Sequence, residues 1–326
     1  MTYSLWIDGF TTMDPDQSGG KSLFCYRLGR CMQDQGMMEV TDDRTRRVDF
    51  SLNVIQIHNP NARKKILRLD GVWHDTGKDY KAKNVGMQRA LRNCDAVVYQ
   101  SQFAKRMADT FLGKPDVPTA VIPNGTNLNL YPEAIPFQHD GPVFLAVSKW
   151  RPHKRLEDTI EAFLLAAIPN ALLVIAGDLS KSGVSENRMR QYHRNPSLRF
   201  VGHVPQYALA NLMKAAYASI HLCWFDACPN SVVEALSFGV PVITNNVGGT
   251  RELVELATFD SRLICEVDQP YNLEPVDLYH PPKIDRRKIA QAIRLCHDDV
   301  RPTVNRQAVS IERVASQYHT FMEGLL

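Results

Sequence analysis

A cluster of cations follows an apolar run in the second half of the chain. The run begins at Phe144 and reads as a buried strand, and Lys149, Arg151 and Lys154 come directly after it. Cations at the carboxyl end of a parallel strand are suited to a diphosphate, because ligands of such sheets bind beyond that end. The residues alone equally allow a solvated loop, since most Lys and Arg side chains are exposed.

A second group of polar residues lies further along the chain, between His221 and Leu253. A strand is predicted to end at Cys223, and the loop after it holds Asp226. A helix is predicted to begin near Asn230, a residue type that favours helix N-caps. Its first backbone N–H groups would bind an anion, and they belong to the residues that follow the cap, Ser231 and Val232.

Two carboxylates of this stretch could meet one ligand. Seven residues separate Asp226 in the loop from Glu234, which is one turn into the helix. A carboxylate pair is suited to binding sugar hydroxyls, because ionised oxygens accept strong hydrogen bonds. The alternative for Glu234 is a solvated position on the helix surface.

From Phe144 to Val254 the chain resembles the retaining glycosyltransferases of family 4, which have two Rossmann-like domains in the type B arrangement (GT-B). The resemblance implies that Lys149 and Lys154 hold the donor diphosphate. Lys149 stands where the family carries Arg, and an ammonium cannot make the bidentate fork of a guanidinium, so Arg151 is a candidate substitute.

The resemblance also implies roles for the acidic residues. Glu234 would hold the ribose hydroxyls of the nucleotide, and Asp226 would hold a hydroxyl of the donor sugar. The family carries Glu at position 226, and the shorter acid is compatible with a different sugar, a shifted loop or weakened activity. Gly248-Gly249 and Glu252 match a turn that shapes the family's pocket. Gly202 and His203, in the run FVGHV, lie where the family's backbone reads the base.

The first half resembles the family less strongly. A Gly-Gly loop at Gly19-Gly20 follows the first predicted strand, and by resemblance Gly20 touches the donor. The run RLDGVWHDTG follows another strand and should open onto the cleft between the domains. His74 is the candidate for touching the sugar, and Asp70 and Trp73 are the candidates for the acceptor. The alternative, which the residues favour equally, is a simple turn at Asp70-Gly71 with His74 as an ordinary loop residue.

Alternating strand and helix patterns predict an α/β fold with two Rossmann-like domains facing a cleft. We expect an N-terminal acceptor-side domain over residues 1–136, a nucleotide-sugar domain over 137–309 and a C-terminal helix over 310–326 that crosses back onto the first domain. The predicted strands are Tyr3-Ile7, Val54-Ile57, Ile66-Leu69, Ala96-Gln100 and Ala120-Ile122 in the first half, and Val143-Val147, Leu172-Ala176, Leu198-Val201, Ser219-Cys223, Val240-Thr244 and Leu263-Cys265 in the second.

Composition narrows the class of protein. An apolar content of 44% with 22% charged residues is that of a globular protein, and a net charge of +3 does not by itself indicate a nucleic-acid or membrane partner. The seven cysteines never form a C-x-x-C pair, so neither a zinc site nor a disulfide framework is expected. With no signal peptide or transmembrane segment recognised at this stage, we expect a cytoplasmic protein.

Two motifs are set aside. The GGKS run at Gly19 imitates the end of a P-loop, but the upstream glycine of that pattern falls on Pro15. The Asp14-Pro15-Asp16 run imitates a metal-binding Asp-x-Asp, and a Pro-rich turn is the better account.

We therefore expect a retaining, metal-independent glycosyltransferase without a cofactor, whose partners are a nucleotide sugar and an acceptor. Retention is implied by the resemblance alone. The base, the sugar, the oligomeric state and the acceptor (a glycan, lipid, protein, small molecule or modified nucleic acid) are not identified by the sequence. An epimerase and a non-catalytic nucleotide-sugar-binding protein are the alternatives. A Rossmann dehydrogenase is disfavoured, because no G-x-G-x-x-G follows a predicted strand.

Overall fold

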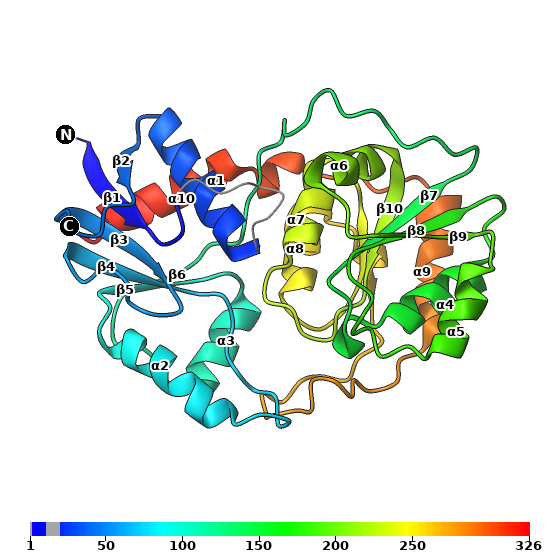
Figure 1. The fold of residues 1–326 in the computed structure, drawn as a ribbon, viewed down its shortest axis with the longest axis horizontal. Coiled ribbons are helices and arrows are strands. Elements are labelled where there is room, and N and C mark those ends of the chain that lie inside the picture. Colours follow the sequence, from blue (N-terminus) through cyan, green and yellow to red (C-terminus); the bar gives the residue numbers. More distant parts are fainter. Residues whose placement is uncertain (1, 11–19) are drawn as a thin grey trace. The chain divides into compact units, whose positions relative to one another are not determined.

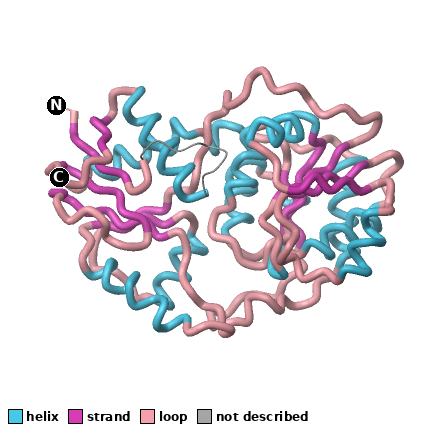
Figure 2. Tube along the Cα trace, viewed as in Figure 1, coloured by secondary structure: helices cyan, strands magenta, loops and turns pink. Residues whose placement is uncertain are grey.

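The structure is a computed structural model that describes residues 2–10 and 20–326, and the side chains from residue 22 onward in the second of these ranges. The described residues form two parallel six-stranded sheets flanked by helices (Figures 1 and 2). This confirms the predicted α/β class with two Rossmann-like domains. The chain divides into two compact units, Met1–Leu128 with Asn272–Val276 and Gln307–Leu326, and Asn129–Tyr271 with Asp277–Arg306. Residues 129–136, 272–276 and 307–309 thus fall outside the unit that the predicted division gave them.

The first unit contains a sheet of strand order β2-β1-β3-β4-β5-β6. Its strands are β1 (Tyr3–Ile7), β2 (Met38–Thr41), β3 (Val48–Val54), β4 (Ala62–Leu69), β5 (Ala96–Tyr99) and β6 (Thr119–Val121). Helices α1 (Gly20–Asp34) and α10 (Ile311–Glu323) cover one face, and α2 (Tyr80–Arg92) and α3 (Gln102–Phe111) cover the other (Figure 1). The apolar face of α10, with Val314 and Tyr318 fully buried, completes the core beneath α1.

The second unit has the strand order β12-β11-β10-β7-β8-β9. Its strands are β7 (Val143–Val147), β8 (Leu172–Ala176), β9 (Leu198–Gly202), β10 (Ala216–His221), β11 (Val242–Asn245) and β12 (Ile264–Cys265). Helices α4 (Leu156–Ala166), α5 (Glu186–His193) and α9 (Arg286–Asp298) lie on one face, and α6 (Gln206–Ala215), α7 (Asn230–Ser237) and α8 (Gly249–Thr258) lie on the other (Figure 1). The strands are nearly continuous apolar runs because both faces of the sheet are covered.

The predicted strand Val54-Ile57 is wrong, although three of its four residues are apolar and β-branched. Strand β3 ends at Val54 because Ile55 has a left-handed φ of 69°, which breaks the extended conformation. The buried Asn53 then holds the following loop, since its Oδ1 accepts hydrogen bonds from the backbone N–H groups of His58 and Asn59 at 2.9 and 3.0 Å. The sequence pattern therefore placed the strand several positions too far along the chain, because the residues after Val54 belong to a loop at the ligand-side edge of the sheet.

Strand ends in the second unit also differ from the sequence pattern. The predicted strand Ser219-Cys223 is β10, which runs from Ala216 and ends at His221. Cys223 consequently lies in the loop that carries Asp226 rather than in the sheet. No helix of the described residues has the length and apolarity needed to span a membrane.

Candidate functional site

The loops after β7 and β10 meet at one point of the second sheet. Strands β7 and β10 are hydrogen-bonded neighbours, but the chain continues from β7 to β8 on one side and from β10 to β11 on the other. This reversal of strand order is where open α/β sheets bind their ligands, beyond the carboxyl ends. The predicted cations come from the first loop, and Asp226 comes from the second.

Lys154 and Asp226 form an ion pair at this point, with 2.5 Å between Nζ and Oδ2. Burial alone would raise the pKa of the Asp226 carboxyl, but the Lys154 ammonium and His221 outweigh it, and the pKa is well below its usual range. Burial likewise opposes charge on Lys154, but Asp226 holds the pKa of the ammonium above its ordinary value. The pair is therefore charged across the physiological pH range, and both side chains stay partly open to solvent.

The other two predicted cations do not join this pair. Arg151 Nη1 lies 3.5 Å from the hydroxyl of Tyr279. Lys149 is exposed, and its charge, after the hydrogen bonds from Ser180, helps to lower the pKa of Asp178. Of the three predicted cations, Lys154 thus forms an ion pair, Arg151 is half-buried and Lys149 is exposed.

Helix α7 begins as predicted at Asn230, but Asn230 is not its N-cap. The cap is Pro229, which has no side-chain acceptor, and Asn230 is the first helical residue. The Val232 N–H donates to the Pro229 carbonyl at 3.1 Å, so it is already used within the turn. Ser231 N–H makes no hydrogen bond to any described residue and is the first-turn amide open to an anion.

Glu234 is buried on α7, with 7% of its surface exposed. This excludes the alternative of a solvated surface position. A carboxylate is rarely buried without a partner, and the start of the helix also favours negative charge nearby. Glu234 is thus a fixed acidic group one turn inside the helix that follows the Asp226 loop.

The Gly248-Gly249 turn supports the Asp226 loop directly. The Gly249 N–H donates to the Asp226 carbonyl at 2.7 Å. Gly248 has a φ of 93°, and a Cβ at this position would lie 3.0 Å from the Asp226 carbonyl oxygen. Glycine is required here both by backbone conformation and by the close approach of the loop. Glu252 follows in the first turn of α8.

With this geometry in view, the second unit matches a family of known proteins. Residues 129–274 match the model of "Glycosyl transferases group 1". Residues 129–274, which are less than half of the chain, are called the glycosyl transferase domain after the family that they match.

Curated relatives are about a quarter identical to this chain over the residues that align. Glycogen synthase of Mycobacterium tuberculosis is 26% identical over 167 residues, which are 50% of this chain and 40% of the relative. N-acetyl-alpha-D-glucosaminyl L-malate synthase of Bacillus anthracis is 22% identical over 187 residues, which are 56% of this chain and 46% of the relative. The chain thus spans less than half the length of these relatives.

Solved structures share the fold over the whole chain. Sucrose-phosphate synthase from Thermosynechococcus elongatus has a TM-score of 0.66 at 16% identity, covering 100% of this chain and 95% of that one. Anabaena HepE in complex with UDP-glucose has a TM-score of 0.58 at 17% identity, covering 99% and 97%. The fold is that of the GT-B glycosyltransferases, as the resemblance implied.

A buried ion pair that the sequence analysis missed supports the base of the glycosyl transferase domain's site. Arg155 follows Lys154 in a left-handed conformation and donates to both oxygens of Asp268 at 2.5 and 2.8 Å. Asn245, at the end of β11, donates to the same carboxylate at 2.6 Å. Both ionic side chains are fully buried. Arg155 stood in the cationic run, but nothing in the sequence pattern linked it to a residue more than a hundred positions away.

The segment 266–285, which begins inside the glycosyl transferase domain and continues beyond it, was also missed as part of the site. Its Asp268 pairs with Arg155, and its Tyr279 contacts Arg151. The ring centroid of its Tyr271 lies 4.5 Å from that of Phe225. Residues 272–276 within it belong to the first unit. The segment has no regular structure, so periodicity could not have found it.

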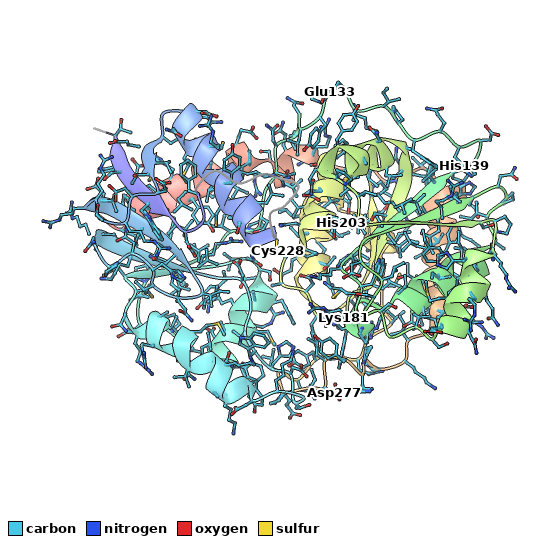
Figure 3. The ribbon with its side chains drawn as sticks, in the orientation of Figure 1. Glu133, His139, Lys181, His203, Cys228 and Asp277 are labelled. Atoms are coloured by element: carbon cyan, nitrogen blue, oxygen red, sulfur yellow. The ribbon has the colours of Figure 1, made fainter. Side chains whose placement is uncertain are left out.

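The predicted base-reading residues lie at the end of β9 in the glycosyl transferase domain. Gly202 has a left-handed φ of 66°, and its carbonyl accepts a hydrogen bond from Gly177 N–H at 2.6 Å. His203 is exposed beyond this strand end (Figure 3). The backbone of β9 is thus bound to the end of β8, beside the strand β7 that leads to Lys154.

Outside the glycosyl transferase domain, Asp70 belongs to a polar network rather than to a simple turn. Gln100 Nε2 donates to Asp70 at 2.9 Å, and the buried guanidinium of Arg68 lies 3.3 Å from the Asp70 carboxylate. Arg68 also donates to Asn124 at 2.5 Å. These residues stand at or just after the carboxyl ends of β4, β5 and β6, so the network lines the ligand-side edge of the first sheet.

Trp73 and His74 follow in the same loop. The Trp73 backbone is clamped by Asn84, which accepts from its N–H and donates to its carbonyl, and the indole stays 39% exposed. His74 packs on Phe111, and burial lowers the pKa of its imidazole. Gly20 is the first residue of α1, whereas Gly19, the Asp14-Pro15-Asp16 run and the rest of the upstream loop lie outside the described residues.

Proposed function

We propose that this chain is a glycosyltransferase that moves a sugar from a nucleoside-diphosphate donor to an acceptor. The observation that carries the proposal is the Lys154–Asp226 pair, which stands at the strand-order reversal of the second sheet, beside the start of α7. A diphosphate needs a cation and open N–H groups, and a sugar hydroxyl needs a carboxylate. The group 1 glycosyl transferase match covers the same residues.

Lys154 would contact the donor diphosphate while its ammonium remains paired with Asp226. An ammonium donates up to three hydrogen bonds, and Asp226 takes one of them. The remaining donors, the Ser231 N–H and the Arg151 guanidinium would face the phosphate oxygens. The second carboxylate oxygen of Asp226 would accept a hydroxyl of the sugar, and Glu234 would accept those of the ribose.

In the proposed reaction, the bond between the anomeric carbon and the diphosphate oxygen breaks, and its electron pair leaves with the diphosphate. An acceptor oxygen bonds to the same carbon, and its proton passes to a phosphate oxygen, which gives retention when both events occur on one face. Lys154 and Arg151 stabilise the growing negative charge, and preorganised charges of this kind are worth about 3–4 kcal/mol each. In this proposal no metal ion is needed to neutralise the leaving group.

For the donor base and the acceptor we propose a class of molecule rather than one compound. The HepE structure was solved with UDP-glucose, so uridine diphosphate sugars are the first donors to test. In the first unit, the Asp70 network and Trp73 are the proposed acceptor contacts, with His74 against the sugar. Polar groups and an exposed indole suit a polyhydroxylated acceptor, since carbohydrate rings present both hydroxyls and an apolar face.

The test is a binding and transfer experiment on the whole chain. Nucleoside diphosphates and their sugars are screened by thermal unfolding, where a ligand at a hundred times its Kd adds about 2.7 kcal/mol of stability. The hits are then incubated with acceptor mixtures and assayed for free nucleoside diphosphate. Binding without release would favour a non-catalytic binding protein, conversion of donor to its epimer would favour an epimerase, and no binding of any nucleotide would refute the proposal.

A further inference from the structure

Three side chains of types that bind metal ions lie together at the Lys154–Asp226 pair, and Asp226 is one of them. They are His221, Cys223 and Asp226, and their ligand atoms all lie within 4.8 Å of one another. The spacing is His-x-Cys-x-x-Asp over the end of β10 and the loop that follows. His221 is the last residue of β10, and the loop that follows brings Cys223 and the Asp226 carboxylate close to it.

The imidazole of His221 is aimed into this cluster and is unsatisfied. It is 6% exposed, and in the part of the chain that the structure describes its Nε2 makes no hydrogen bond. Nε2 lies 3.8 Å from Asp226 Oδ2. Buried polar atoms of side chains are nearly always hydrogen-bonded, so this buried nitrogen has an unused position for a further partner.

The geometry is close to that of a divalent metal site. Zinc-type ions bind Cys, His and carboxylate ligands at about 2.0–2.3 Å in a tetrahedron, which separates the ligand atoms by roughly 3.3–3.8 Å. The His221–Asp226 separation of 3.8 Å is at the upper end of this range, so the two groups must approach by a few tenths of an ångström to bind one ion. The thiol of Cys223 donates to the Phe225 carbonyl at 3.0 Å, so a small rotation that exchanges this weak bond for a metal bond completes three ligands.

We infer that the His221–Cys223–Asp226 cluster binds a borderline-soft divalent cation of the zinc class, and that this cation displaces the Lys154 ammonium from Asp226. The nitrogen, sulfur and carboxylate donor set selects Zn²⁺ or Co²⁺ over Mg²⁺ or Ca²⁺, which prefer oxygen ligands. The cluster uses three protein ligands and leaves one position open for water or a phosphate oxygen.

The charges balance in this exchange. The cluster now holds one ammonium and one carboxylate, with Cys223 as a thiol. On metal binding, Cys223 loses its proton to solvent, so two positive charges on the metal meet a thiolate and a carboxylate. Lys154 stays protonated and turns toward solvent, to which its side chain is already 17% exposed. The metal and Lys154 therefore compete for the same carboxylate.

This competition predicts a regulatory effect, which rests on the proposed function. With the metal bound, Asp226 is removed from the donor sugar, so micromolar zinc should inhibit transfer and a chelator should restore it. Cation binding itself does not depend on the proposed function, so the two can fail separately.

The test is a metal titration of the whole reduced chain with Co²⁺, followed by Zn²⁺ in competition with a chromophoric chelator. We expect a cobalt–thiolate charge-transfer band in the wild type. Cys223→Ser should lose this band and bind Zn²⁺ at least ~10-fold more weakly, the smallest effect typical of perturbed metal sites. Cys265→Ser, a buried cysteine of β12 outside the cluster, is the matched control and should keep both properties.

A second variant guards against misfolding, because a gain of affinity cannot come from an unfolded chain. Lys154→Met keeps the length of the side chain and removes the competing charge, so it should bind Zn²⁺ more tightly than the wild type. The inference is refuted if Cys223→Ser binds Co²⁺ like the wild type, or if Lys154→Met binds Zn²⁺ no more tightly. If the metal binds as expected but transfer is never detected with any donor, the site stands and the proposed function fails.

Discussion

Lys154, from the loop after β7, and Asp226, from the loop after β10, meet at 2.5 Å although 72 positions separate them in the sequence. The two residues belong to the two stretches that were recognised independently, one as a diphosphate site and the other as a sugar site. Their pairing means that neither acts alone: Asp226 orients the ammonium, and the ammonium keeps the carboxylate ionised.

Removing the Lys154 charge should abolish transfer. Lys154→Ala takes away the cation that we propose for the leaving diphosphate, and loss of one such preorganised group costs about 10²–10³ in kcat. Lys181→Ala is the control, because Lys181 is exposed in the loop after β8 (Figure 3). Rates are measured at saturating donor, with thermal unfolding to check the fold. Equal rates for the two variants would remove Lys154 from the site.

The proposed role of Asp226 can be tested by separating sugar recognition from nucleotide recognition. Asp226→Asn should reduce transfer strongly, because an amide accepts a weaker hydrogen bond from a sugar hydroxyl. Binding of the free nucleoside diphosphate should be unchanged or tighter, since Lys154 is then no longer shared with a carboxylate. Asp226→Glu should change the preference among donor sugars. Calorimetric titration with diphosphate and with intact donor measures both, and equal losses for the two ligands would mean that Asp226 only shapes its loop.

Glu234→Gln tests the proposed ribose contact. The substitution keeps the size of a buried side chain and replaces a charged acceptor by a neutral one, so the nucleoside diphosphate should bind roughly tenfold more weakly. Glu255→Gln, an exposed acid on α8 paired with Arg251, should bind like the wild type. If both variants bind the nucleotide equally, the assignment of Glu234 to the ribose is wrong.

The glycine turn behind Asp226 gives a steric prediction. Gly248→Ala introduces a Cβ 3.0 Å from the Asp226 carbonyl at a φ of 93°, which should cost on the order of 1–3 kcal/mol and displace the loop. Gly36→Ala also meets a positive φ, 64°, but has open space around it. Donor affinity measured by titration should fall for Gly248→Ala alone, and parallel losses in the two variants would show a general effect of backbone strain.

The buried Arg155–Asp268 pair should matter to stability far more than an exposed pair does. Arg155→Ala leaves the Asp268 carboxylate buried and unpaired by charge, a change that typically costs about 3–5 kcal/mol. Arg262→Ala breaks the more exposed pairs with Asp260 and Asp299 and should change the free energy of unfolding little. Urea unfolding compares the two, and similar losses of unfolding free energy would show that the buried pair stabilises the fold no more than the exposed pairs do.

Local sequence determined the elements that consist of one buried apolar run. Strands β7 and β8 have the bounds that their patterns predict, because a parallel strand covered on both faces must be apolar throughout. The start of α7 at Asn230 was also predictable, although its cap was not, since Pro229 precedes it and carries no capping oxygen.

Tertiary structure decided what depended on contacts between distant segments. The order of the strands, and not any local pattern, brings the loops after β7 and β10 together, and so pairs Lys154 with Asp226. The same loop placed Cys223 beside His221 and Asp226, in a spacing that no C-x-x-C pattern reveals. The sequence by itself determined which residue types stand at the strand ends, because local burial selects them. Which of them meet was decided only by the folded sheet, because pairing across more than a hundred positions, as for Arg155 and Asp268, leaves no periodic signal in the chain.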